Sequence, residues 1–269
     1  MLLQFVVQNY ASIKDEVILS FEPSSDQEHP ENILSKGKYK AGGITAIYGA
    51  NASGKTNVYK AMTMALVILR ASNIRQINDQ IPTVPFKFNT ESVSSPSRFE
   101  FTFVANDGKK YIYGFSADQY KVHEEYLYRY NTSRPALVFD RKGAEYKFAR
   151  SERRFLDPLV RMNTENKLFL ATATTWNVES TTIPYRWLAE GIDAYTNDEN
   201  LTNIALNMYR TDQEANIKFT AKLLRQADIN ISDIQVESNR IDNPQGAPLL
   251  GGIIIAGQLI QPQEQYEIK

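Results

Sequence analysis

Residues 49–56 read Gly-Ala-Asn-Ala-Ser-Gly-Lys-Thr and match the phosphate-binding pattern G-x-x-x-x-G-K-[ST] at every fixed position. Small residues allow successive backbone N–H groups to turn toward one anion. Lys55 is expected to reach the β- and γ-phosphates of ATP, and the Thr56 hydroxyl is the expected Mg²⁺ ligand. The alternative is a plain glycine-rich turn between a strand and a helix. The predicted nucleotide-binding residues are Gly49, Ala50, Asn51, Ala52, Ser53, Gly54, Lys55, Thr56 and Asn57.

The position of this loop depends on the segments before and after it. The apolar run at 44–49 predicts a short buried strand that ends at Gly49. After Lys55 the period changes, and the apolar residues recur on one helical face of about four turns that ends near Ser72. Such a helix would direct its unpaired N–H groups and the positive end of its dipole at a phosphate. The apolar residues of that face are Val58, Met62, Ala65, Leu66 and Leu69.

Strand patterns dominate the rest of the N-terminal half. Residues 2–7 and 16–21 predict two strands that could pair as a hairpin, and 36–43 predict a loop. Alternating aromatic residues at 99–103, 111–115 and 126–130, with turns at 106–108 and 142–143, predict an antiparallel meander over 98–148. We interpret these aromatic stripes as one buried face of a sheet rather than a base-stacking platform.

The remaining chain is mixed. Helices are predicted at 153–162, 183–190, 199–210 and 214–227, and a strand at 231–238. A further apolar run at 251–259 is followed by no acid pair. The predicted organisation is strands, loop and helix in 1–72, an antiparallel β-subdomain in 73–150 and a mixed region in 151–269. Glu124 and Glu125 are adjacent acids, but neighbours in a strand point to opposite faces, so we assign this pair no catalytic role.

Composition narrows the class of protein. The chain of 269 residues is 42% hydrophobic and 23% charged, as in ordinary globular domains, and it can bury a sizeable core. Its net charge of −1 gives no overall basic field for nucleic acid, and it has no cysteine for disulfides or thiolate metal sites. The first residues lack the pattern of a signal peptide, and the apolar runs are too short to span a bilayer. We expect a cytoplasmic protein without membrane contact.

The N-terminal segment VVQNYASIKDE, the loop YGANASGKTN and the segment IPTVPFKF resemble the ABC/SMC-like ATP-binding proteins of the AAA type. Among these are the ATPases of Septu-, PARIS- and retron-type phage-defence and abortive-infection systems. The resemblance implies an α/β P-loop NTPase fold, an ABC-ATPase-like first lobe with an antiparallel β-meander subdomain and C-terminal helices. It also implies head-to-head ATPase contacts in a homo-oligomer and a partner effector such as a nuclease. Binding of nucleic acid is left open.

Two departures from the family pattern matter. Ala11 stands in the early turn where many relatives place a basic residue that approaches the nucleotide. No signature segment and no Walker B strand ending in Asp-Glu follows the loop, and Asp233 stands alone before Ile234. We therefore expect these residues to be the first lobe of a larger ATPase and to be inactive in ATP hydrolysis by themselves, because half a site neither positions nor stabilises the transferred phosphoryl group.

Two other functions remain open. One is an SMC-like ATPase of DNA repair or chromosome organisation, which would require long heptad-bearing helices. Residues 70–230 show short strands and short helices instead, without sustained heptads. The other is a scaffold that senses ATP without hydrolysing it.

Overall fold

The computed structural model describes residues 1–24, 28–195, 208, 213–227 and the strands at 236–239, 253–255, 258–260 and 265–268. The chain divides into two compact units, Met1–Ala194 and Tyr195–Lys269. Among the described residues, no helix combines the length and the apolar character that crossing a bilayer would require.

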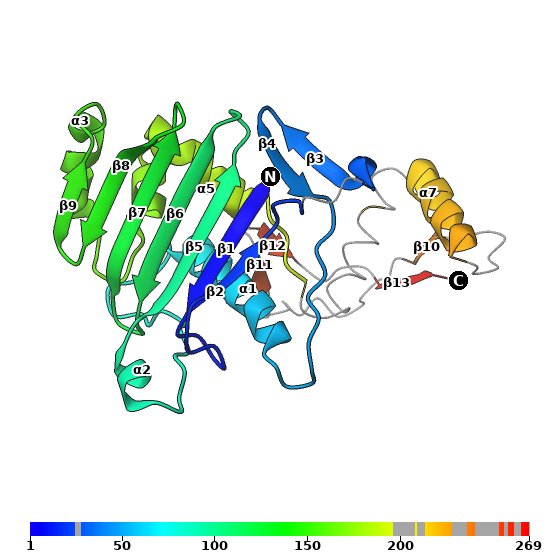
Figure 1. Ribbon diagram of the computed structural model, residues 1–269, viewed down its shortest axis with the longest axis horizontal. Helices are drawn as coiled ribbons and strands as arrows, with labels where there is room; N and C mark the ends of the chain where they lie inside the picture. Colours follow the sequence, from blue (N-terminus) through cyan, green and yellow to red (C-terminus); the bar gives the residue numbers. More distant parts are fainter. Residues whose placement is uncertain are drawn as a thin grey trace. The chain divides into compact units, whose positions relative to one another are not determined.

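A seven-stranded sheet forms the body of the first unit (Figure 1). Its spatial order is β2-β1-β5-β6-β7-β8-β9, and every neighbouring pair is antiparallel. The predicted hairpin of the first two strands and the predicted meander are both confirmed, and they join through β1 and β5 into one sheet. Its strands are β1 (Leu2–Gln8), β2 (Val17–Ser20), β5 (Ser97–Val104), β6 (Lys110–Ala117), β7 (Val122–Tyr130), β8 (Pro135–Lys142) and β9 (Glu145–Phe148).

Helices cover one face of this sheet (Figure 1). The long helix α1 contacts β1, β5 and α5, and its start at the loop and end before Ser72 agree with the predicted helix. The predicted helix at 153–162 is a short α-helix followed by a 3₁₀ helix, and the one at 183–190 begins earlier. The helical elements of the unit are η1 (Pro30–Asn32), α1 (Lys55–Ala71), α2 (Thr90–Ser94), α3 (Arg153–Leu156), η2 (Asp157–Met162), α4 (Phe169–Thr175) and α5 (Glu179–Glu190).

The core lies between α1, α4, α5 and the aromatic face of the meander. Phe99, Phe101 and Phe103 of β5 are fully buried and lie opposite buried aromatic residues of β6 in register, with Phe101 paired to Tyr113. Trp187 of α5 stacks on Phe103 with 4.4 Å between ring centroids. Alternation in a half-buried strand therefore explains the two aromatic stripes of β5 and β6, as predicted.

The prediction that the aromatic residues at 126–130 lie on the buried face of the sheet is wrong. Tyr126, Tyr128 and Tyr130 of β7 are only partly buried, whereas Leu127 between them is fully buried beneath the helices. Tyr126 lies across Gly114, where an added Cβ would be 2.5 Å from the tyrosine Cζ. The glycine of β6 therefore leaves the space that this ring occupies on the open face of the sheet.

Two predictions for the segments before the loop 49–56 are wrong. The segment 36–43 is not a plain loop, because β3 (Ile33–Lys36) and β4 (Tyr39–Gly42) pair there as an antiparallel hairpin. Residues 44–50 are not a buried strand: they have no strand geometry, and Ile44 and Tyr48 are 88% and 90% exposed. A strand needs a hydrogen-bonding neighbour, and no described strand pairs with this segment.

The second unit is described by separate elements. Its helix α7 (Gln213–Gln226) confirms the helix predicted at 214–227. Two antiparallel pairs join β10 (Val236–Asn239) to β13 (Gln265–Ile268) and β11 (Ile253–Ile255) to β12 (Gln258–Ile260). The last two strands lie in and next to the apolar run 251–259, and β10 coincides with the end of the strand predicted at 231–238. The helix predicted at 199–210 and Asp233 lie outside the described residues.

Candidate functional site

The backbone of the loop at 49–54 is shaped by left-handed residues. Ala52 has φ of 63° and Gly54 has φ of 92°, and the Ser53 N–H donates to the Ala50 carbonyl at 3.2 Å. An added Cβ on Gly49 would lie 2.8 Å from the Ser53 hydroxyl. The two fixed glycines of the sequence pattern thus stand where the backbone turns tightly or takes a positive φ.

Lys55 bridges the loop. Its ammonium group donates to the Gly49 carbonyl at 2.8 Å and to the Ala50 carbonyl at 2.7 Å. The side chain therefore folds back over the residues that precede it rather than extending into solvent. This contact brings the positive charge to the mouth of the loop, where a phosphate ligand would need it.

Helix α1 starts at Lys55 without a side-chain cap. Gly54 is the N-cap residue and has no side chain that could accept the first N–H groups. The first turn also carries Thr56, which is exposed, and Asn57, whose Nδ2 donates to the Ser12 hydroxyl at 2.6 Å. Uncapped N–H groups and the helix dipole make this terminus a favourable position for an anion.

The early turn between β1 and β2 forms one wall of the loop. Asn9 and Ala11 have φ of 53° and 52°, and the Asn9 amide donates to the carbonyls of Ser92 and Ser95 at 2.8 and 2.9 Å. This turn presents Ser12 so closely that a Cβ on Gly54 would lie 3.2 Å from its hydroxyl. Segments far apart in the sequence are therefore locked together at the loop.

A cavity of about 490 Å³ opens beside the loop. Three residues of the predicted set line it: Ser53, Gly54 and Lys55. The other six do not: Gly49, Ala50, Asn51, Ala52, Thr56 and Asn57. Lys14 and Phe86 were not predicted as site residues, because no local spacing connects either of them to the loop. Both nevertheless lie in segments that carry the family resemblance, Lys14 in VVQNYASIKDE and Phe86 in IPTVPFKF. The cavity is lined by Ser12, Ile13, Lys14, Asp15, Val17, Ile47, Tyr48, Ser53, Gly54, Lys55, Val58 and Phe86.

Lys14 is a basic residue in the same early turn in which Ala11 replaces the basic residue of many relatives. The family pattern expects a basic residue in this turn, and Lys14 lies three positions later and lines the cavity beside the loop. Asp15 is the one carboxylate among the residues that line it. Neither acid of a Walker B pair is seen there, and Asp233 lies outside the described residues.

The adjacent acids Glu124 and Glu125 lie in β7, and their surroundings differ. Glu124 is exposed, whereas Glu125 is fully buried and accepts from the Phe169 and Leu170 N–H groups at 2.6 and 2.8 Å. Its carboxylate lies 3.6 Å from the guanidinium group of Arg141, which is 2% exposed. Burial raises the pKa of Glu125, while Arg141 and the two N–H groups oppose the rise. Glu125 therefore caps α4 in the core rather than facing the nucleotide loop.

The chain matches the model of a known protein family. The family model described as "AAA domain, putative AbiEii toxin, Type IV TA system" matches residues 44–240, which include the loop and α1. A search of curated proteins finds no match.

Proposed function

The chain belongs to this family of AAA ATPase domains linked to abortive-infection toxin–antitoxin systems, and we propose that it binds ATP and Mg²⁺ at the loop 49–57. The observation that carries the proposal is the glycine-bounded loop with Lys55 folded over it at the uncapped start of α1. A plain turn would need neither a lysine bonded to two loop carbonyls nor a terminus without a side-chain acceptor.

Each residue of the loop has a proposed role. The backbone N–H groups of Ala52 and Gly54 are offered to the phosphates, and the Lys55 ammonium group balances the charge of the β- and γ-phosphates. Thr56 offers its hydroxyl to Mg²⁺. When bound, Mg²⁺ neutralises charge on the β- and γ-phosphate oxygens. Lys14 adds a second cation at the cavity wall.

Hydrolysis requires more than this cradle. Phosphoryl transfer depends on a group that positions water and on charges that stabilise the transition state. Among the residues that the structure describes, Asp15 is the one carboxylate that lines the cavity. We therefore expect residues 1–269 alone to hydrolyse ATP only at a background rate and full activity to require a further acidic pair and head-to-head assembly. The effector that ATP binding would power or gate is expected to be a partner protein such as a nuclease.

A nucleotide sensor that binds ATP without turnover is the second candidate. The observation in its favour is the same shortage of carboxylates at the cavity. A phosphate-release assay on residues 1–269 beside their Lys55→Ala variant addresses hydrolysis. Turnover that disappears in the variant would show that a catalytic carboxylate lies within this chain, and Asp233 would be the first residue to substitute.

The binding proposal is tested by calorimetry with ATP and Mg²⁺. Lys55→Ala should lower the affinity for ATP at least about tenfold, because a charge-assisted hydrogen bond contributes about 1.5–3 kcal/mol. Lys60→Ala is the matched control, since Lys60 is an exposed lysine of the same helix. It should leave the affinity within about twofold, because its charge is screened by solvent. Equal ATP affinity in the wild type and Lys55→Ala would overturn the proposal.

A further inference from the structure

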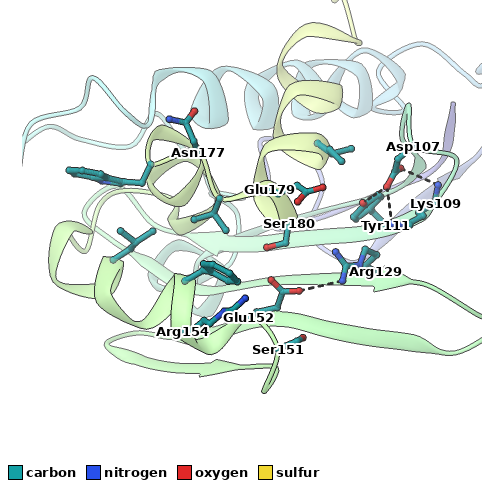
Figure 2. Close-up of a pocket in the computed structure, with 15 residues that line it drawn as sticks. Asp107, Lys109, Tyr111, Arg129, Ser151, Glu152, Arg154, Asn177, Glu179 and Ser180 are labelled. Atoms are coloured by element: carbon teal, nitrogen blue, oxygen red, sulfur yellow. Dashed lines mark hydrogen bonds and ion pairs between the residues drawn. The ribbon is translucent and has the colours of Figure 1, made fainter.

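A second cavity, of about 640 Å³, lies in the first unit at the start of α5. It shares no lining residue with the nucleotide loop. We call it the α5 cavity. Residues of α3, η2 and the turn from α4 to α5 line it, together with side chains of β6 and β7 (Figure 2). A cavity of this size matches those that hold small organic ligands.

One side of the α5 cavity is apolar and aromatic. Leu159, Val178 and Ile183 line it, and the rings of Phe155 and Trp176 stand at its margin with exposures of 48% and 56%. The Arg154 guanidinium group lies over the Phe155 ring, 4.4 Å from its centroid. Neither Phe155 nor Trp176 packs on another aromatic ring among the described residues. Exposed rings beside an aliphatic wall are suited to stacking on a flat ligand.

Polar groups without partners lie on the other side. Ser180 is 7% exposed, and its hydroxyl finds no hydrogen-bond partner among the described residues. The Nε of Arg129 is also buried without a partner, although its Nη2 donates to Glu152 at 3.3 Å. Figure 2 shows Ser180 of α5 and Arg129 of β7 extending toward the same space. Two buried polar groups left unpaired in one cavity indicate a ligand that pairs them.

The start of α5 adds further donors. Its N-cap residue is Val178, which has no side chain that accepts a hydrogen bond, and Glu179 and Ser180 are the first helical residues. Their N–H groups have no carbonyl within the helix to bond. A ligand in the α5 cavity is therefore offered more donors than acceptors.

The charges of the α5 cavity argue against an anionic ligand. Two ion pairs join residues that both line the cavity: Lys109 lies 3.7 Å from Asp107, and Arg129 lies 3.3 Å from Glu152. Opposite charges are present in equal number, so there is no excess that would attract a phosphate or a carboxylate. The charged residues that line it are Asp107, Lys109, Arg129, Glu152, Arg154 and Glu179.

We propose that the α5 cavity binds a nucleobase: a neutral, flat heterocycle that lies against both Phe155 and Trp176 and accepts hydrogen bonds from Ser180 and Arg129. The ring nitrogens and carbonyl groups of the base would accept hydrogen bonds from Ser180 and Arg129, which have no acceptor for these donors among the residues that the structure describes. The flat face of the base would cover the aromatic and aliphatic side of the cavity. The same chemistry occurs in a free nucleoside and in an unpaired base of a single strand. The site is independent of ATP binding at the loop.

Trp176 provides the readout, because the chain has only one other tryptophan. Trp187→Phe keeps an aromatic ring in the core and leaves Trp176 as the one source of tryptophan fluorescence. Adenosine, guanosine, cytidine and uridine are each titrated into this variant. Saturable quenching by at least one of them is expected. A single-stranded hexanucleotide of the same base is the second arm: tighter binding identifies a strand as the source, and equal or weaker binding identifies the free nucleoside.

Three substitutions in this background test the assignment. Ser180→Ala should weaken nucleoside binding about fivefold to tenfold, the effect of one hydrogen bond, without lowering the stability of the protein. Phe155→Leu keeps an apolar side chain but removes the ring, and it should weaken binding by a similar factor. Ser35→Ala, which removes an exposed hydroxyl from the β3–β4 hairpin, is the control and should change nothing.

Lys55→Ala separates this proposal from the function of the loop. It should leave nucleoside quenching unchanged, because a nucleoside has no phosphate for Lys55 to bind. The proposal is overturned if no nucleoside or hexanucleotide gives a saturable response. It is equally overturned if quenching persists at full affinity in both Ser180→Ala and Phe155→Leu.

Discussion

The helices α1 and α4 begin in contrasting surroundings. At α4 the first two N–H groups donate to the carboxylate of Glu125, which reaches the helix from β7 and is itself held near Arg141. At α1 the N-cap is Gly54, and a cavity opens beside it. The start of α4 is satisfied by a buried protein group and supports the fold. The start of α1 has no side-chain acceptor and carries Lys55 beside a cavity, so it is suited to an external anion.

The largest expected effect comes from breaking the buried side of this comparison. Glu125→Ala should lower the free energy of unfolding by about 3–5 kcal/mol, because it leaves Arg141 buried without its carboxylate and two N–H groups without an acceptor. Glu124→Ala is the matched control, since this exposed neighbour makes only a surface contact with Lys142 at 3.4 Å. Its effect should stay below about 1 kcal/mol. Urea unfolding measures both, and similar losses would show that the buried network does not stabilise the core.

A smaller effect should distinguish two glycines with positive φ. Gly143 has φ of 57° and no atom within 4 Å of an added Cβ, while Gly54 has φ of 92° and Ser12 at 3.2 Å. Alanine at either position should lower stability by about 1–2 kcal/mol through the left-handed backbone alone. Only Gly54→Ala should also weaken ATP binding, by at least about tenfold, since it alters the loop. Calorimetry beside urea unfolding checks this, and full ATP affinity in Gly54→Ala would contradict it.

The smallest effect tests the exposed segment before the loop. Ile44→Ser should change the free energy of unfolding by no more than about 0.5 kcal/mol, because Ile44 is 88% exposed. Ile68→Ser, at a fully buried position of α1, should lower it by about 3 kcal/mol or more. Thermal unfolding compares the two. A loss at Ile44 as large as that at Ile68 would restore the interpretation of 44–49 as a buried strand.

Local patterns predicted those parts of the molecule that local chemistry decides. The period of α1, the alternation of Phe99 to Phe103 and the turn at Gly143 all follow from backbone geometry and burial on one face. The side of the sheet to which Tyr126 points depends on Gly114 of the neighbouring strand, which spacing alone does not reveal. The segment 44–49 carries the apolar residues of a strand, but strand formation depends on a partner segment.

The candidate site likewise contains residues that the local sequence predicts and residues that it does not. The loop 49–56 was recognised because all its ligand groups are contiguous, whereas Lys14 and Phe86 reach the cavity through the folding of distant segments. The α5 cavity has no motif at all. Its groups come from β6, β7, α3, η2 and α5, so only the folded chain brings Arg129 near Ser180.

The contact between Lys55 and the carbonyls of Gly49 and Ala50 makes ligand entry a competition. The Lys55 ammonium group is already bonded to two carbonyl oxygens, at 2.8 and 2.7 Å. An incoming anion has to displace these oxygens before it can bind the ammonium group. A weakly charged oxyanion gains little from this exchange, while the clustered charges of a nucleoside triphosphate gain much more. Under the proposed function, we expect this competition to favour a nucleoside triphosphate over a small inorganic anion at the loop.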